Sequence, residues 1–183
     1  MCAQENNDSS NDFFKGWRFG LKAGVNFSTM FGDVGDNSFL FFPHAGAVAD
    51  KDITEVVTLS TEPHFSGEGQ NLNGGYERVI FFNIPVLVKY NASPELSIDG
   101  GLHTGIKIAE TTKFGQSGEK RNRNRYKRIA PGITGGATYA IDGNWFTQVR
   151  ANLKLSDVIR ADAGDTEGST ILTLQLSVGY WLD

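Results

Sequence analysis

Apolar and polar side chains alternate strictly from Trp17 to Ser28, where every second residue is apolar and the residues between are charged, polar or glycine. Successive side chains of a β-strand point to opposite faces, so a period of two predicts a strand rather than a helix. Comparable segments recur along the chain. The pattern predicts eight strands, at residues 17–28, 41–50, 56–66, 78–90, 96–108, 126–140, 144–155 and 170–182.

The connections between these segments alternate between short and long. Short turns are expected at residues 51–55, 91–95 and 141–144, and longer polar loops at 30–40, 67–77, 109–125 and 156–169. An up-and-down barrel whose two ends lie on its short-turn side has this arrangement, and outer-membrane barrels combine short periplasmic turns with longer external loops. Residues 1–16, rich in Asn, Asp, Ser and Glu, are predicted to be a flexible polar segment that precedes a barrel of residues 17–183.

The glycines indicate which face of the barrel points inward. On a solvent-facing strand they would only weaken the sheet, whereas inside a narrow barrel they leave room for neighbouring long side chains. Many fall in the same alternate set as the charges: Gly20, Gly24, Gly46, Gly101, Gly105, Gly132, Gly136 and Gly179. The polar set is therefore predicted to face the lumen.

The opposite set of side chains carries almost no charge and includes Phe19, Ile84 and Leu174. A soluble monomer rarely exposes so large an apolar surface, whereas lipid tails accept it. No stretch of the chain approaches the roughly 18 to 20 apolar residues of a membrane-spanning helix. The predicted fold is all-β: an eight-stranded antiparallel up-and-down transmembrane barrel with a polar lumen filled by side chains.

The lumen is predicted to hold a charge network. An eight-stranded barrel is just wide enough for its own side chains, and buried charges need partners, so we expect Glu62 to pair with Arg150 or Lys89. A general diffusion pore is not expected. The network residues are Arg18, Lys22, Glu62, Lys89, Asp99 and Arg150. Further inward positions are Asp50, Lys107, Lys154, His44, His64 and His103.

The amino-acid composition excludes several classes of protein but identifies no reactive site. The net charge of −4 is too small to suggest a nucleic-acid partner, and 22 glycines with only 5 prolines do not describe a low-complexity chain. Cys2 is the only cysteine, so no intrachain disulfide can form. The tail of a secretory signal, a cloned start and a lipid-attachment site remain open for the residues around Cys2.

The most localised charge lies in the third long loop, since residues 113–128 contain seven Lys or Arg residues and one Glu. Arginine binds phosphate in a bidentate geometry, so the segment is predicted to bind lipopolysaccharide phosphates or an acidic protein partner. The alternative is a solvated loop that binds nothing. The candidate residues are Lys120, Arg121, Arg123, Arg125, Lys127 and Arg128. The fourth loop is acidic, with Asp157, Asp162, Asp165 and Glu167, and a pairing of the two loops is possible.

Neither a catalytic nor a metal site is predicted. The three histidines lack the local spacing of a metal site, and no nucleophile motif accompanies the Ser, His and Asp residues. No cofactor is expected.

Several segments resemble a known family. Asn83–Tyr90, with the sequence NIPVLVKY, is similar to the LNIPVLVKY strand of the small outer-membrane β-barrel family, a porin-like family of Bacteroidetes also described as OmpW/OmpA-like. Leu21–Asn26 resembles its first strand, and Arg150–Leu153 and Gln175–Tyr180 its last two. Thr61–His64 replaces a more apolar stretch and places Pro63 in a strand, which suggests a bulge. The resemblance implies an outer-membrane location and brings no catalytic residues.

The sequence therefore predicts an integral outer-membrane barrel without enzymatic activity. Its expected role is structural or accessory, engaging a partner protein or a surface lipid through external loops. Two alternatives stay open: a narrow channel for ions or small solutes, and a soluble ligand-binding barrel.

Overall fold

The computed structural model describes residues 16–31, 39–72, 75–114, 117–120, 126–155 and 170–182. Of the predicted polar N-terminal segment, only Gly16 falls within this part of the chain. The described residues form ten strands: β1 (Trp17–Phe31), β2 (Leu40–Asp52), β3 (Val57–Thr61), β4 (His64–Leu72), β5 (Gly75–Asn91), β6 (Leu96–Phe114), β7 (Ser117–Lys120), β8 (Ile129–Ala140), β9 (Trp145–Lys154) and β10 (Thr170–Trp181). No helix in these ranges is long and apolar enough to cross a membrane.

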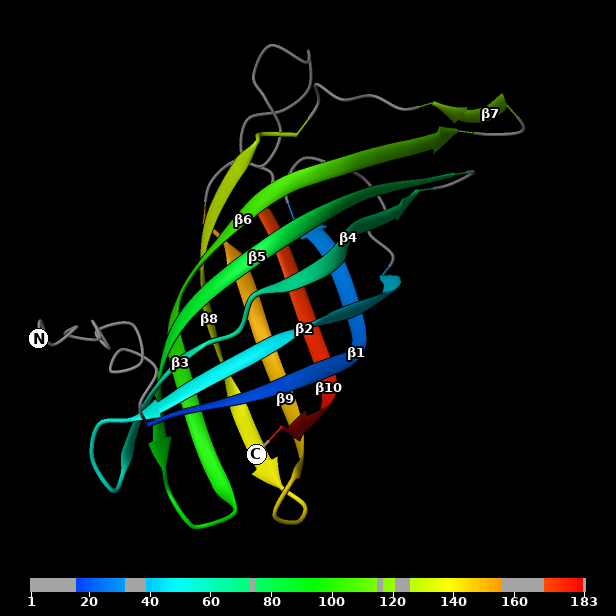
Figure 1. Ribbon diagram of the computed structural model, residues 1–183. Helices are drawn as coiled ribbons and strands as arrows, with labels where there is room; N and C mark the ends of the chain where they lie inside the picture. The colour runs from blue at the N-terminus through cyan, green and yellow to red at the C-terminus, as the bar shows by residue number, and fades with distance from the viewer. Residues whose placement is uncertain are drawn as a thin grey trace, which may run out of the picture.

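The strands close into one antiparallel barrel (Figure 1). β1 pairs with β2 on one side and with β10 on the other, so the first and last strands join and seal the sheet. β3 and β4 occupy one position in the wall, because both pair with β2 and β5. β7 is a short strand that pairs only with the end of β6. The prediction of an eight-stranded antiparallel barrel is confirmed.

Proline explains why the predicted strand at residues 56–66 is two strands. Pro63 has no N–H to donate to a ladder, and the regular strand stops at Glu62 and Pro63. The chain remains attached to β2 because the Ala47 N–H donates to the Pro63 carbonyl at 3.0 Å. The wall is thus continuous, with an irregularity at the level of Glu62.

The two ends of the barrel differ. Tight turns at residues 53–56, 92–95 and 141–144 lie at one end, which we call the turn end; the opposite end, where β4 ends at Leu72 and β6 ends at Phe114, is called the loop end (Figure 1). The predicted loop at 67–77 is wrong, since β4 runs to Leu72 and β5 begins at Gly75. The predicted loop at 109–125 also starts too early, because β6 continues to Phe114. These extensions are polar, so they lack apolar alternation although their backbones remain paired.

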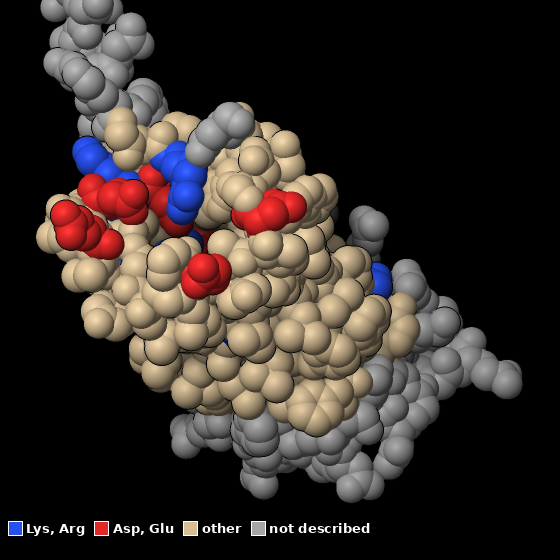
Figure 2. All heavy atoms as spheres, turned by 90° about the horizontal axis from the view of Figure 1, so that it is seen from below, with Lys and Arg blue, Asp and Glu red and all other residues tan. Residues whose placement is uncertain are grey.

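Burial alternates along the wall with the predicted orientation. On β9, Gln148 and Arg150 are buried, whereas Trp145 and Val149 are exposed. The contrast is large on β1, where Leu21 is 55% exposed and its neighbour Lys22 only 3%. A soluble protein shows the reverse distribution. Seen from the turn end, charged side chains gather around the mouth, and the part of the wall that is in view carries almost no charge (Figure 2).

Candidate functional site: the filled lumen and the loop-end rim

Glu62 is the centre of the lumen. It is fully buried where β3 gives way to β4, and cations from three other strands converge on its carboxylate. Lys22 Nζ donates to Oε2 at 2.6 Å, and Arg150 donates to both oxygens, with Nη1 2.5 Å from Oε2 and Nη2 3.1 Å from Oε1. Lys89 Nζ lies 3.1 Å from Oε1. The structure thus brings both predicted partners, Arg150 and Lys89, to Glu62 and adds Lys22.

Two further carboxylates balance these cations. Asp50 accepts hydrogen bonds from Lys89 Nζ at 3.1 and 3.0 Å, and Asp99 Oδ1 lies 3.0 Å from Arg150 Nη2. Three cations therefore face three carboxylates across the width of the lumen. We call this group the central charge layer; it consists of Lys22, Asp50, Glu62, Lys89, Asp99 and Arg150.

Arg18 departs from its predicted place inside the lumen. Its side chain is 48% exposed and lies 3.9 Å from Asp50. The guanidinium stacks 4.0 Å from the centre of the Trp181 ring. Because Arg18 is the second residue of β1, its inward side chain reaches only the turn-end rim.

A second ion pair lies nearer the loop end. Lys154 Nζ donates to Glu68 Oε2 at 2.5 Å, and the amide of Asn83 and the hydroxyl of Ser66 both donate to Glu68 Oε1 at 3.0 Å. Glu68 is buried, although the sequence pattern placed it in a loop. It was missed because the alternation of β4 loses its apolar half beyond Phe65.

Two of the three lumenal histidines make polar side-chain contacts. His44 Nε2 lies 2.9 Å from Ser177 Oγ, and His64 Nε2 lies 3.2 Å from Gln175 Nε2. The rings of His44 and His64 are 6.0 Å apart, and His103 is buried on β6. Within the described ranges, no three His, Cys, Asp or Glu side chains are grouped so that they could hold a metal ion.

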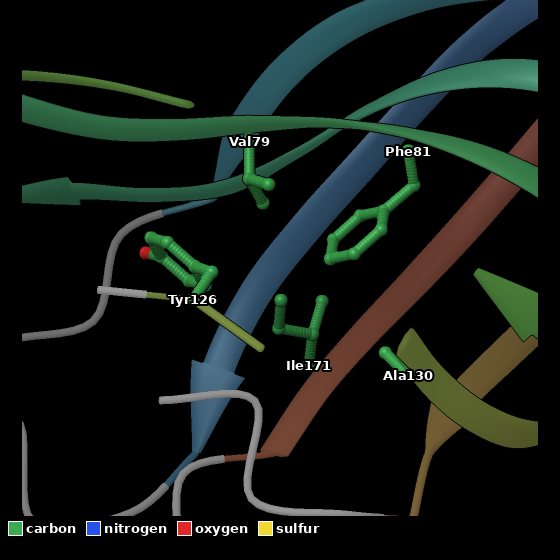
Figure 3. Packing of buried hydrophobic residues seen from close by; sticks show 5 residues of the cluster. All are labelled: Val79, Phe81, Tyr126, Ala130 and Ile171. Carbon is green, nitrogen blue, oxygen red and sulfur yellow. The ribbon is translucent and has the colours of Figure 1, made fainter. Parts of the chain in front are cut away.

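Two clusters of apolar side chains also lie in the lumen, one toward each end. At the loop end, five residues from β5, β8, β10 and the segment before β8 pack together, each at most 1% exposed (Figure 3): Val79, Phe81, Tyr126, Ala130 and Ile171. At the turn end, Val48, Phe146 and Trp181 form a smaller cluster. Gly179 makes room for it, because a Cβ there would lie 2.0 Å from the Phe146 ring.

A cavity of about 500 Å³ opens at the turn end, beside this smaller cluster. Its lining includes Arg18, Asp50 and Lys89, together with the acidic rim residues Asp52 and Glu95. Ion pairs already join Asp50 to Lys89 and Arg18. The cavity is therefore the outer surface of the central charge layer rather than a separate pocket.

Tyr126 fastens the basic loop to the barrel. Its hydroxyl donates to Glu77 Oε2 at 3.2 Å, its N–H donates to Glu110 Oε2 at 3.3 Å, and its carbonyl accepts from Lys107 Nζ at 2.7 Å. The sequence pattern placed Tyr126 at the start of a strand without this role. The inward carboxylates Glu77 and Glu110 lie on the strand extensions that the pattern treated as loops.

The structure describes three of the six predicted basic residues. Lys127 is half-buried and Arg128 is exposed at the loop-end rim, and the backbone of Lys120 pairs with Thr112. Arg121, Arg123 and Arg125 lie outside the described residues. The acidic residues of the fourth loop, Asp157, Asp162, Asp165 and Glu167, also lie outside them.

Comparisons with known proteins agree with this architecture. Residues 2–160 match a family model described as an outer membrane protein beta-barrel domain. No curated protein matches the chain. Among solved structures, Neisserial surface protein A is 8% identical, with 88% of this chain and 96% of that chain covered and a TM-score of 0.61. Ail of Yersinia pestis is 11% identical, with 90% and 98% covered and a TM-score of 0.54.

A second structure of Ail, in complex with the heparin analogue sucrose octasulfate, is 13% identical to this chain. The match covers 91% of this chain and 99% of that chain, with a TM-score of 0.53. At these identities the likeness concerns the fold.

Replacing Glu62 with Gln tests the charge balance of the lumen. Glu62→Gln leaves Lys22 without its carboxylate and weakens the hold on Arg150 and Lys89, and removing one partner of a buried ion pair costs about 3–5 kcal/mol. Urea unfolding from lipid vesicles should show a loss of this size. The exposed rim variant Asp52→Asn should lose less than about 1 kcal/mol. Equal losses in the two variants would contradict the central role of Glu62.

Proposed function

This chain belongs to the outer membrane protein beta-barrel domain family and resides in the outer membrane, and from that premise we propose that it is a closed, non-enzymatic barrel that binds lipopolysaccharide phosphates at its loop end. Outer-membrane barrels place their longer loops outside the cell, where lipopolysaccharide lies. Because the chain resides in the outer membrane, the alternative of a soluble ligand-binding barrel is wrong.

The distribution of charge carries the proposal. The central charge layer pairs its cations with carboxylates, and Lys154 pairs with Glu68. By contrast, residues 113–128 contain seven cations and one Glu in the sequence. Arg128 is exposed at the loop-end rim. Arginine clusters recognise phosphate groups through charge-assisted, often bidentate hydrogen bonds.

The structure of Ail with sucrose octasulfate offers a supporting parallel. That barrel, of the same fold, binds a small polyanion in the crystal. Sucrose octasulfate and the phosphorylated core of lipopolysaccharide share closely spaced negative groups on a sugar. The parallel favours an anionic glycolipid over an acidic protein as the ligand of the basic segment.

The filled lumen supports a role without transport or catalysis. Apolar clusters lie at both ends, and the charges between them are engaged with one another. In the described part of the chain, the cavity at the turn end is lined by Asp50 and Lys89, which are already joined in an ion pair. The loop end, where Arg128 is exposed, is the part of the molecule for which we propose an interaction.

Neutralising Arg121, Arg123 and Arg125 tests whether lipopolysaccharide binds to the basic segment. We expect the triple variant Arg121→Ser, Arg123→Ser, Arg125→Ser to bind purified lipopolysaccharide about tenfold more weakly, since three lost charge contacts of about 0.5 kcal/mol each sum to that factor. Calorimetry on the detergent-solubilised protein measures it. The control variant Asp162→Asn, Asp165→Asn, Glu167→Gln alters an acidic loop by the same amount of charge and should bind at least as tightly as the wild type. Unchanged affinity in the arginine variant would refute the proposal, and so would equal binding of dephosphorylated lipopolysaccharide.

Conductance tests whether the lumen is closed. The wild-type protein in a planar bilayer should give no stable unitary current steps, because charged and apolar side chains fill an eight-stranded interior. A porin of known conductance, recorded in the same bilayer, serves as the positive control. Reproducible unitary steps from the wild type would favour the narrow channel instead.

A further inference from the structure

We infer that Tyr126 is the positioning residue of the anion site at the loop end: its anchorage in the lumen fixes the backbone that carries the rim cations Lys127 and Arg128 before an anion binds. This inference rests on the proposed function and adds to it the device that arranges the site.

The side chain of Tyr126 is held as a core residue although it comes from a polar, basic segment. It is 1% exposed and lies among Val79, Phe81 and Ile171 in the loop-end cluster (Figure 3). Its hydroxyl donates to the buried carboxylate of Glu77 at 3.2 Å. The packing of the ring fixes the position of a buried tyrosine, and the hydrogen bond of its hydroxyl fixes the direction in which the ring points.

The backbone around Tyr126 is fixed as well. The Tyr126 N–H donates to Glu110 Oε2 and the Tyr126 carbonyl accepts from Lys107 Nζ. The Lys107 N–H in turn donates to the Arg128 carbonyl at 2.8 Å. Lys107 and Glu110 are also joined to each other, with Nζ 2.7 Å from Oε2. Residues 126–128 are therefore tied to β6 at both of their ends.

The other side of the basic segment is attached to the same strand. β7 pairs with the end of β6, with Lys120 opposite Thr112 and Ser117 opposite Phe114. Both residues that flank the stretch 121–125 thus lie at fixed places near the loop end of β6. The backbone on each side of residues 121–125 is therefore attached to β6 before any ligand arrives.

Fixing cations before binding reduces the conformational entropy lost when an anion binds. This matters most for arginine, whose planar guanidinium must match the orientation of a phosphate. Tyr126 itself carries no charge. Its contribution is therefore geometric, and the long-range attraction of the segment for anions does not depend on it.

The test compares Tyr126→Ser with the wild type in calorimetric titrations with sucrose octasulfate and with purified lipopolysaccharide. We expect Tyr126→Ser to weaken both affinities about three- to tenfold. The factor should be the same at low and at high salt, because no charge is removed. The arginine triple variant should instead lose less at high salt, because screening already weakens its missing contacts.

Two controls separate positioning from general loss of stability. Phe146→Ser removes a buried aromatic ring from the turn-end cluster and should leave both affinities unchanged. Tyr126→Phe keeps the ring and the backbone bonds and should lose less than Tyr126→Ser. Gel mobility without heating verifies that each variant is a folded barrel. If Tyr126→Ser does not fold, Tyr126→Leu replaces it, since it retains apolar volume in the cluster and loses the hydroxyl.

The outcomes distinguish the two hypotheses. If the arginine triple variant binds like the wild type, the proposed function is wrong. If that variant binds weakly while the serine or leucine variant of Tyr126 binds like the wild type, the proposed function stands and the positioning role is refuted. A loss in Phe146→Ser as large as that in Tyr126→Ser would also refute it.

Discussion

Pairing of buried charges around Glu62 is the constraint on which the rest of this structure depends. Hydrocarbon outside the barrel requires apolar side chains there, and the strict alternation of a strand then sends every other residue inward. In so narrow an interior, charged groups are costly unless they meet opposite charges. Glu62 meets this requirement for three cations at once, with Asp50 and Asp99 completing the balance.

Because side chains fill the interior, the two ends of the barrel are where a ligand would bind. Apolar clusters lie toward both ends of the lumen and paired charges lie between them, so the interior packs like a protein core that is polar in its middle. The loop end differs from the turn end, because strands β4, β5 and β6 continue past the apolar belt and carry inward carboxylates with them. Those carboxylates hold Tyr126 and, through it, the end of the basic segment. Buried carboxylates with hydrogen-bonded partners thus stabilise both the interior and the loop-end rim.

Much of this arrangement could be read from the sequence, for physical reasons. Alternation gave the strand positions and the glycines gave the inward face, so the pairing of Glu62 with Arg150 and Lys89 could be anticipated without coordinates. The strand extensions were not predicted, since strands that leave the membrane lose the apolar alternation that identifies them. The anchorage of Tyr126 depends on those extensions and was missed for the same reason. Arg18 was placed too deep because alternation gives a side chain its face and not its depth.

Accessibility of spin labels along β10 tests the central claim of orientation most directly. Labels at positions 173 to 178 in lipid vesicles should alternate: those replacing Leu174, Leu176 and Val178 should be relaxed strongly by oxygen, which concentrates in hydrocarbon. Labels replacing Thr173, Gln175 and Ser177 should be shielded from both oxygen and a water-soluble nickel chelate, because those side chains are buried in the lumen. Strong relaxation by the chelate at the first set, or by oxygen at the second, would contradict the account.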